Sequence, residues 1–202
     1  MITIIKTEIS NSYSVQKSLT RIGYKSLITD NKDDIKNATM IILPGVGSFD
    51  ALVRSLELND LIPILSEKVQ KDLVPTLGIC LGMHVMTKKS DEGVMKGLGF
   101  IDAEVKKFNS SKNLKVPHFG WNSAEAVNSL DLMKNCDNNF YFAHSYYVEC
   151  QNKENILLST NYGINFCSAF INNNIIGVQF HPEKSSKSGL QFLDNIMRYF
   201  DV

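Results

Sequence analysis

The chain has 202 residues, of which 44% are hydrophobic and 21% charged, as in an ordinary soluble globular protein. Its 21 basic and 21 acidic residues give a formal net charge of zero, so it lacks the basic excess of general nucleic-acid binders. No apolar run approaches the roughly 18 residues of a membrane span, and Met1–Ile5 is too short for the core of a signal peptide. We therefore expect a single cytoplasmic domain over residues 1–202 that binds neither nucleic acid nor a membrane.

The cysteines Cys80, Cys136, Cys150 and Cys167 form no C-x-x-C pair, and no histidine lies at metal-ligand spacing from another. A chain of this length buries enough surface to fold without disulfides, so we expect free thiols in a reducing compartment. The sequence predicts no structural metal and no cofactor. The open question is whether one of the cysteines is reactive.

The first half of the chain alternates short apolar runs with amphipathic stretches, which indicates parallel strands joined by crossover helices. The expected strands are Ile2–Ile5, Tyr24–Ile28, Met40–Leu43 and Val74–Ile79. The expected helices begin at Asn11 or Ser12, run from about Phe49 to Gln70 with a break near Asn59–Pro63, and cover Leu81–Lys89. The strands are apolar throughout, as in a sheet with both faces covered.

The second half predicts strands separated by turn residues, which indicates antiparallel hairpins added to the parallel sheet. These strands are Leu98–Val105, Leu114–His118, Ser123–Val127, Phe140–Val148, Ile156–Tyr162, Phe166–Ile171 and Ile175–Phe180. A closing amphipathic helix is expected over Gln191–Phe200. The whole pattern predicts a three-layer α/β fold, with a mostly parallel central sheet that carries added antiparallel strands.

A cysteine lies between two glycines where an expected strand meets an expected helix, in Gly78-Ile79-Cys80-Leu81-Gly82. This G-x-C-x-G spacing is the thiol counterpart of the nucleophile elbow G-x-S-x-G. A nucleophile on so sharp a turn needs neighbours without side chains, and the next backbone N–H can then stabilise an oxyanion. The five residues alone fit a buried structural cysteine beside turn glycines equally well.

A thiol nucleophile needs a base, and the base needs an orienting group. His181 follows the last expected strand directly, and Pro182 places Glu183 two residues further on. On an extended segment these two side chains point to the same side, so the carboxylate can hold the imidazole. The pair alone also fits a loop histidine beside a solvated glutamate, but together with the elbow it favours a catalytic triad.

Six separated segments carry a more specific signal. They are Leu43–Phe49, Leu77–Met83, Glu92–Gly99, Val116–Asn122, Phe142–Tyr147 and Gln179–Ser185. In this order they resemble the class I (triad) glutamine amidotransferases, and within them most closely the glutaminase subunits of imidazole glycerol phosphate synthase. The resemblance covers most of the chain and implies a flavodoxin-like three-layer fold.

The resemblance implies a role for each motif. Cys80 attacks the side-chain amide of L-glutamine, His181 passes a proton to the departing ammonia, and Glu183 orients His181. The resulting thioester is hydrolysed to glutamate. The oxyanion hole is expected from backbone N–H groups of Leu81 and of Gly45, Val46 and Gly47. In this family that strand reorients a peptide for activity, which glycine permits; without the resemblance it also fits a tight turn.

The resemblance also assigns substrate and partner contacts. Glu92 binds the α-amino group of glutamine, and backbone groups of Ser145 and Tyr146 bind its α-carboxylate, while His84 occupies a further substrate-contacting position. The expected partner is a (β/α)8-barrel synthase subunit of histidine biosynthesis, which forms a heterodimer and receives ammonia through a channel. Residues at positions that face it are Asn11, Pro117, His118, Gly120, Trp121, Asn122 and Lys184. Taken alone, Trp121 also fits a core position.

Two departures from the family pattern leave other interpretations open. His84 replaces the usual glutamine four residues after the nucleophile, and Lys6–Asn11 replaces a loop that carries two glycines and an aspartate in the family. These changes fit a paralogous glutaminase that feeds a different synthase, such as one that forms an amidino group on a surface sugar. A non-catalytic scaffold is a further alternative. A thiol peptidase is disfavoured, because it leaves the Trp121 and Tyr146 motifs unexplained.

Overall fold

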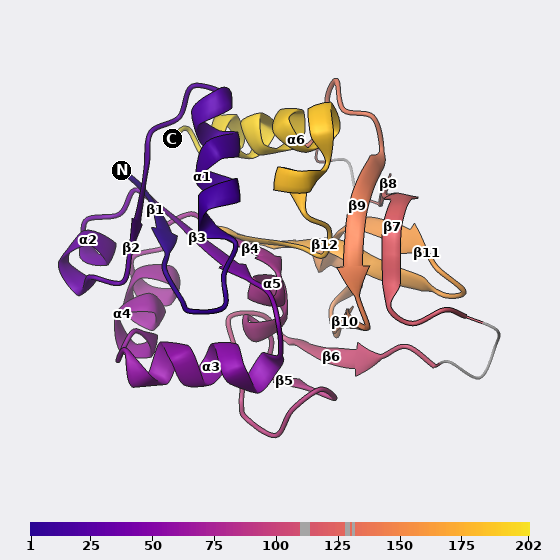
Figure 1. Cartoon of the computed structure of the whole chain (residues 1–202), viewed down its shortest axis with the longest axis horizontal. Coiled ribbons are helices and arrows are strands. Elements are labelled where there is room, and N and C mark those ends of the chain that lie inside the picture. Colours follow the sequence, from indigo (N-terminus) through magenta and orange to yellow (C-terminus); the bar gives the residue numbers. More distant parts are fainter. Residues whose placement is uncertain (110–113, 128–129, 131) are drawn as a thin grey trace.

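The computed structural model describes residues 1–109, 114–127, 130 and 132–202 (Figure 1). Within these residues eleven strands form one sheet, whose main path has the order β2-β1-β3-β4-β13-β12-β10-β6-β5. Strand β11 pairs with β12, and β8 pairs with β11. Two further strands, β7 and β9, form a small separate sheet. The expected α/β fold, with antiparallel strands added to a parallel sheet, is confirmed.

The parallel half of the sheet places the elbow strand in its interior. Its strands are β1 (Ile2–Ile5), β2 (Ser26–Thr29), β3 (Met40–Gly45), β4 (Thr76–Cys80) and β13 (Ile175–Val178). Strand β4 is parallel to β3 on one side and to β13 on the other, with Val178 opposite Ile79. The segment that follows β13 therefore continues beside Cys80.

The antiparallel half extends the sheet and supports the small one. Its strands are β5 (Lys89–Ser90), β6 (Ala103–Lys107), β8 (Glu125–Ala126), β10 (Tyr146–Cys150), β11 (Ile156–Asn161) and β12 (Asn165–Asn172). The small sheet pairs β7 (His118–Ser123) with β9 (Asn139–His144) in antiparallel register, with His118 opposite His144. The chain leaves β9 at His144 and enters β10 at Tyr146, so Ser145 lies at the junction of the two sheets.

Helices cover both faces of the main sheet. They are α1 (Ser12–Arg21), α2 (Lys32–Lys36), α3 (Phe49–Leu58), α4 (Ile62–Ser66), α5 (Leu81–Val85) and α6 (Ser186–Tyr199). A π-helical turn, Glu67–Lys71, continues α4, and 3₁₀ turns occupy Lys153–Asn155 and Pro182–Lys184. The break expected near Asn59–Pro63 separates α3 from α4.

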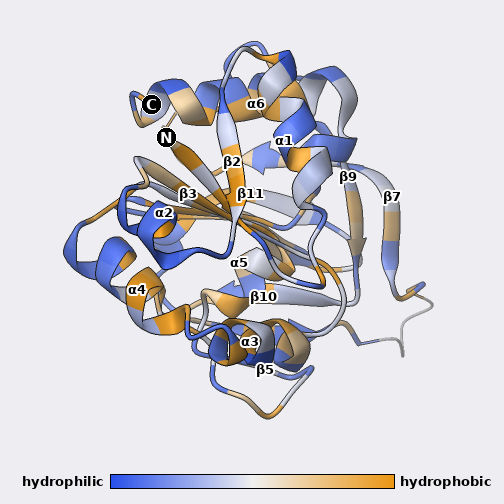
Figure 2. Cartoon of the chain, turned by 60° about the vertical axis from the view of Figure 1, so that its left-hand side comes forward, coloured by the Kyte–Doolittle hydropathy of each residue, from blue (hydrophilic) through white to orange (hydrophobic). Residues whose placement is uncertain are grey.

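Two hydrophobic cores follow from this arrangement. On one face α1 and α6 pack on the sheet through side chains such as Leu19 and Phe192. On the other face α3, α4 and α5 contribute side chains such as Phe49, Leu65 and Met83. Figure 2 shows the apolar central strands between helices whose outer sides are mostly hydrophilic. Burial on both faces explains why these strands are mostly apolar.

Several element boundaries differ from the sequence-based expectation. Strand β6 begins at Ala103 rather than Leu98, because Leu98 and Phe100 donate their N–H groups to carbonyls of residues 85 and 86 in a loop. Helix α5 ends at Val85, four residues earlier than expected. Helix α6 begins at Ser186 instead of Gln191, since its first turn is polar and gives no apolar signal.

Strand β7 was not predicted in its actual place. The sequence predicted strands ending at His118 and beginning at Ser123, whereas residues 118–123 themselves form the strand. These residues include glycine and asparagine, which are depleted in strands, so their propensity hides the element. The expected strand Phe140–Val148 is also divided, at Ser145, into β9 and β10.

No helix in the described ranges is long and apolar enough to cross a membrane. Nor do those ranges contain a group of three or more histidine, cysteine or acidic side chains that could hold a metal ion. None of the four cysteines, all of them in the described ranges, forms a disulfide, and two of them, Cys150 and Cys167, contact each other at 3.8 Å between their sulfur atoms.

Candidate active site

Cys80 ends β4 and stands directly before α5, with φ +53° and ψ −108°. A residue with a side chain adopts such angles only where its surroundings enforce them. A Cβ atom at Gly82 would overlap the carbonyl oxygen of Leu43, and one at Gly78 would come within 2.9 Å of the Gly82 backbone. Both glycines are thus required by the close approach of the strand to the helix. The structure forms the sharp turn that the G-x-C-x-G spacing indicates.

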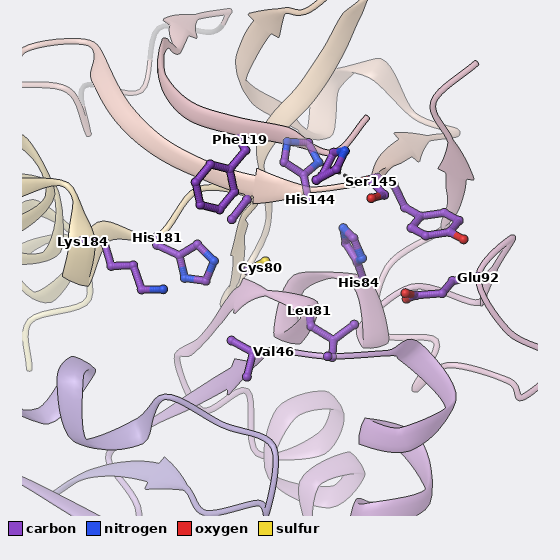
Figure 3. Close-up of a pocket in the computed structure, with 14 residues that line it drawn as sticks. Val46, Cys80, Leu81, His84, Glu92, Phe119, His144, Ser145, His181 and Lys184 are labelled. Atoms are coloured by element: carbon purple, nitrogen blue, oxygen red, sulfur yellow. Dashed lines mark hydrogen bonds between the residues drawn. The ribbon is translucent and has the colours of Figure 1, made fainter. Parts of the chain in front are cut away.

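A cavity of about 320 Å³ opens over the elbow, a volume suited to a small polar molecule. Figure 3 shows Cys80 at its centre, with His181 and Lys184 on one side and His84 and Glu92 on the other. The lining residues are Val46, Gly47, Cys80, Leu81, His84, Glu92, Pro117, Phe119, Ala143, His144, Ser145, Tyr146, His181 and Lys184. Side chains from both sheets and from α5 therefore meet in one place.

His181 is held by a buried carboxylate. Its Nδ1 lies 2.9 Å from Oε1 of Glu183, and both side chains are almost fully buried. The expected extended segment is wrong, because Pro182–Lys184 forms a 3₁₀ turn that brings Glu183 back to the imidazole. The backbone N–H of His181 also donates to the carbonyl of Tyr141, at 2.9 Å. With Nδ1 bound to Glu183, Nε2 is the nitrogen available to Cys80.

The surroundings of His181 favour its protonated form. Burial opposes the charge, but the field of the Cys80 sulfur, a hydrogen bond to that sulfur and the Glu183 carboxylate outweigh burial and raise the pKa of His181 to about 10. The imidazole therefore carries a proton at neutral pH beside the nucleophile. A proton held there can be given to a leaving group as a bond to carbon breaks.

The strand expected to form the oxyanion hole has one N–H engaged elsewhere. The N–H of Val46 donates to the carbonyl of Ile9 at 3.0 Å, so Val46 does not supply a donor to Cys80 in this conformation. Val46 and Gly47 line the cavity while Gly45 does not, and Gly47 has φ +95°. Leu81 is the first residue of α5, and its N–H therefore has no acceptor within that helix.

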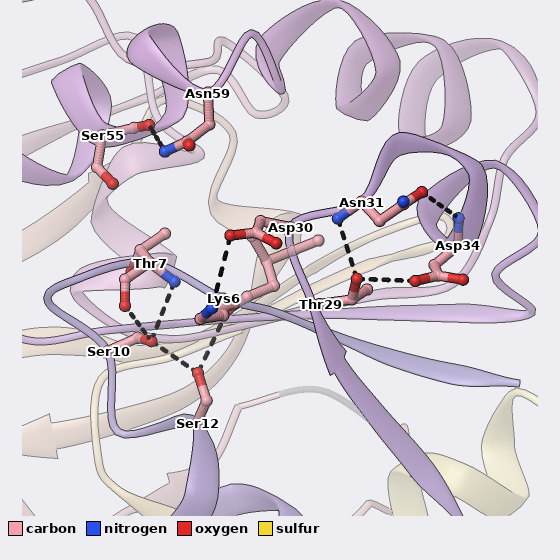
Figure 4. Close-up of polar contacts among 11 residues, drawn as sticks. Lys6, Thr7, Ser10, Ser12, Thr29, Asp30, Asn31, Asp34, Ser55 and Asn59 are labelled. Atoms are coloured by element: carbon pink, nitrogen blue, oxygen red, sulfur yellow. Dashed lines mark hydrogen bonds and ion pairs between the residues drawn. The ribbon is translucent and has the colours of Figure 1, made fainter.

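The first loop contacts the triad itself. Ser10 Oγ donates to the carbonyl of Thr7 at 3.1 Å and lies 2.6 Å from Oγ of Ser12, which makes the loop compact (Figure 4). Asn11, expected at the partner interface, donates its side-chain N–H to Oε1 of Glu183 at 3.3 Å. The segment that departs most from the family pattern thus reaches both Val46 and the orienting carboxylate.

The expected substrate residues lie around the same cavity. Glu92 accepts a hydrogen bond at Oε2 from the backbone N–H of Phe49, at 2.9 Å, and burial raises its pKa. Ser145 and Tyr146 line the opposite wall. His84 is buried, and its Nε2 lies 2.7 Å from Oε1 of Gln179. The four residues are brought together as the resemblance implies, although His84 already has a partner within the protein.

Comparison with known proteins identifies the family. The family model described as glutamine amidotransferase class-I matches residues 3–198. The chain belongs to this family. A curated relative from Methanococcus maripaludis, named imidazole glycerol phosphate synthase subunit HisH 2, is 46% identical over 98% of this chain and 99% of its own length. A second, from Bdellovibrio bacteriovorus, named subunit HisH of the same synthase, is 42% identical over 96% and 98%.

Solved structures share the fold at low sequence identity. One described as a glutamine amidotransferase has a TM-score of 0.75 at 13% identity and covers the whole of this chain and 99% of its own. PurLQS from Thermotoga maritima has a TM-score of 0.72 at 18% identity, over 98% and 97% of the two chains. At such identities the likeness supports the fold alone.

Within this class I glutamine amidotransferase, the expected partner-facing residues fall into two groups. Trp121 is 50% exposed, which excludes the core alternative, and Lys184 is exposed with its Nζ 5.9 Å from the centre of the Tyr141 ring. Pro117, directly before β7, is exposed, and Gly120 and Asn122 on β7 are half-buried. His118, in contrast, is only 3% exposed, because its ring stacks against Phe142 and Tyr162.

Two residues of the amidotransferase site were not identified from the sequence. Phe119 is 70% exposed and lines the cavity, and it stands two residues before Trp121 on β7. Gln179 is fully buried and contacts Cys80, with its Nε2 3.9 Å from Sγ. A signal for Gln179 was present in the sequence, because it stands two residues before His181 on the strand expected to end at Phe180, and side chains two apart on such a strand point to one side.

Proposed function

We propose that this chain is the glutaminase subunit of an imidazole glycerol phosphate synthase, which hydrolyses L-glutamine to glutamate and ammonia. The observation that carries the proposal is the buried contact of His181 with Glu183 beside Cys80, on the floor of a cavity of suitable volume. The names of full-length relatives support the same function.

The chemistry follows from the positions of the three side chains. The Cys80 sulfur attacks the amide carbon of glutamine, and a C–S bond forms as the carbonyl oxygen gains negative charge. His181 gives its proton to the amide nitrogen, the C–N bond breaks, and ammonia leaves a thioester. The imidazole, now neutral, removes a proton from water, which attacks the thioester carbon. The C–S bond then breaks, glutamate leaves, and the Cys80 sulfur is restored beside the protonated imidazole. Glu183 holds the same ring orientation through both halves.

Substrate orientation is assigned to the walls of the cavity. Glu92 binds the α-ammonium group, and the backbone at Ser145 and Tyr146 binds the α-carboxylate. The N–H of Leu81, and that of Val46 after its peptide has turned from Ile9, stabilise the oxyanion. Because the Val46 donor is occupied, we expect low activity until a partner or ligand changes this contact.

The ammonia acceptor is a separate synthase subunit with a (β/α)8 barrel, and the two form a heterodimer. Two exposed aromatic side chains beside the cavity, Phe119 and Trp121, support a docking surface there, since aromatic residues are enriched at such interfaces. Four cysteines without a disulfide among the described residues fit the reducing cytoplasm. The relatives' names give no support to a sugar-modifying synthase, and an intact triad speaks against a scaffold.

The test is glutamate release from L-glutamine by the protein alone, with the synthase subunit, and with that subunit and its nucleotide substrate. We expect strong stimulation only with the complete pair. Cys80→Ala serves as the matched control, since it removes the nucleophile and should abolish release in all three conditions. Absence of stimulation by the histidine-pathway subunit would reject this partner, while rescue of a histidine auxotroph would support it.

A further inference from the structure

Gln179 occupies the position beside the nucleophile that the triad leaves unexplained. It follows β13, next to Cys80 across the strand pair, and its side chain is fully buried. Its backbone N–H donates to the carbonyl of Ser168 at 2.9 Å, which fixes the residue in the sheet. Its carboxamide reaches two groups, the Cys80 sulfur at 3.9 Å and the His84 ring at 2.7 Å.

The His84 contact sets which end of the carboxamide faces the sulfur. His84 is buried, and this burial lowers its pKa to about 4, so the ring is neutral at physiological pH. A neutral imidazole has one N–H, and the amide oxygen can only accept, so the proton lies on Nε2. With Oε1 bound to His84, the NH₂ group is the end that points to Cys80.

We propose that Gln179 is a further catalytic residue of the amidotransferase site, which donates an N–H to the Cys80 sulfur, and that His84 is a positioning residue that holds the Gln179 carboxamide in this orientation. The inference rests on the glutaminase site proposed above and adds a second donor to the nucleophile. His181 supplies one donor, and Gln179 approaches from the β13 side. A negative sulfur accepts such hydrogen bonds more strongly than a neutral thiol.

This arrangement also gives the unusual residue His84 a function. In the described part of the chain, its Nδ1 has no hydrogen-bond partner and is buried, while the residue itself lines the cavity. The ring therefore uses its single N–H to hold Gln179 rather than to bind a ligand. Replacement by glutamine, which also carries an N–H donor, should preserve the contact, whereas phenylalanine keeps a ring of similar shape without a donor.

The test measures the rate of Cys80 alkylation by iodoacetamide between pH 5 and 10, on the protein without any partner, with peptide mass spectrometry to separate Cys80 from the other cysteines. Gln179→Met removes the donor at similar volume. We expect the pH midpoint of Cys80 alkylation to rise, so that the rate below the midpoint falls about tenfold. His84→Phe should shift the midpoint in the same direction, and His84→Gln should return it to within about twofold of the parent rate.

Two controls make the outcome decisive. Ser168→Ala alters a buried neighbour whose hydroxyl has no partner in the described residues and should leave the midpoint unchanged. Thermal unfolding establishes that each variant is folded, and if Gln179→Met is not, the two His84 variants carry the test. The proposal is overturned if the pH midpoint of Cys80 alkylation is unchanged in folded Gln179→Met. It is also overturned if His84→Phe and His84→Gln have the same midpoint. Because alkylation needs neither glutamine nor the synthase, failure of the proposed function leaves this readout intact.

Discussion

His118 on β7 donates a hydrogen bond from its Nδ1 to Nε2 of His144 on β9, and the two nitrogen atoms are 3.0 Å apart. The carbonyl of Tyr146 sets this direction, because it accepts from Nδ1 of His144 at 2.7 Å and leaves Nε2 of that neutral ring as an acceptor. Nε2 of His118 then accepts from the side chain of Asn122, at 3.2 Å. The relay links the surface of β7 to the backbone that lines the substrate cavity, and it requires both rings to be neutral.

This relay predicts acid sensitivity. Burial lowers the pKa of His118 to about 4 and that of His144 well below 6.5. The unfolded chain therefore binds more protons than the folded one as the pH falls from about 6.5 toward 4. The free energy of unfolding should be constant above this range and fall within it, by up to about 1.4 kcal/mol per pH unit for each ring.

Denaturant unfolding between pH 4 and 8 measures this effect. His118→Phe keeps a ring between Phe142 and Tyr162 but removes one titrating group. We expect this variant to be less stable overall and to show a shallower acid slope. An acid slope equal to that of the parent protein would contradict the buried, neutral state of His118.

The triad predicts a separation of two activities. In the complex with the synthase, Cys80→Ala and His181→Ala should lower glutamine-dependent synthesis at least about a thousandfold, since each removes a reacting group. Synthesis from added ammonium should continue in both, because the acceptor site belongs to the partner. Glu183→Gln should be milder, since it keeps a hydrogen bond to His181. Near-normal use of glutamine by Cys80→Ala would reject the mechanism.

The proton on His181 predicts the alkaline limit of activity. Burial opposes its charge, but Cys80 and Glu183 raise its pKa to about 10, so the general acid is present throughout the neutral range and is lost only as the pH rises through that value. The pH profile of kcat/KM for glutamine should therefore be flat from about pH 7 to 9. Glu183→Gln should move the decline to lower pH. A decline near pH 6.5 in the parent protein, where an unperturbed imidazole titrates, would oppose this assignment.

The elbow predicts a steep cost for one methyl group. Gly82→Ala would place a Cβ atom onto the carbonyl oxygen of Leu43, so strand and helix must separate. We expect the free energy of unfolding to fall by more than about 2 kcal/mol and Cys80 alkylation to change with it. Gly99→Ala is the matched control, because Gly99 has φ +66° but no atom within 4 Å of the added group, and should cost about 1 kcal/mol. Equal losses in the two variants would argue against the steric account.

The exposed aromatic pair predicts partner affinity. Trp121→Ala should weaken binding of the synthase subunit at least about tenfold in calorimetry, because large aromatic side chains dominate such interfaces. The free energy of unfolding of this variant should change little, since Trp121 is 50% exposed. Leu58→Ala removes an apolar side chain that is 81% exposed on α3 and should not affect binding. Equal affinities for the Trp121 and Leu58 variants would place the docking surface elsewhere.

Most of the parallel half of the fold was accessible from the sequence because β1, β3 and β4 are buried on both faces. The runs around Ile4, Ile42 and Ile79 are apolar apart from Thr3 and Thr76, and each ends at a turn or a helix signal. The elbow was accessible for a related reason, since two glycines at fixed spacing report a close backbone approach. Local sequence therefore predicts a feature where the burial or the close backbone approach that causes it leaves its pattern within a single segment.

The contacts and elements that the sequence did not predict depend on segments that are far apart in the chain. No local pattern joins Asn11 to Glu183 or Gln179 to Cys80, because each pair is formed by the order of strands in the sheet. His118 illustrates the same limit, since a polar residue in a segment of low strand propensity is buried by four rings from other segments. The 3₁₀ turn after His181 could not be separated from an extended segment by spacing alone.

The place of β13 in the sheet has a consequence for the newly made protein. Cys80 and Gln179 are 99 positions apart, yet β13 completes the sheet on one side of β4 and carries His181 behind it. During synthesis, once β4 has been made and β13 has not, Cys80 has neither Gln179 nor His181 beside it. The edge of β4 that will pair with β13 is then open and can pair with other strands. The nucleophile gains its neighbours only when the sheet closes around it, so reactivity and completed folding arrive in the same step.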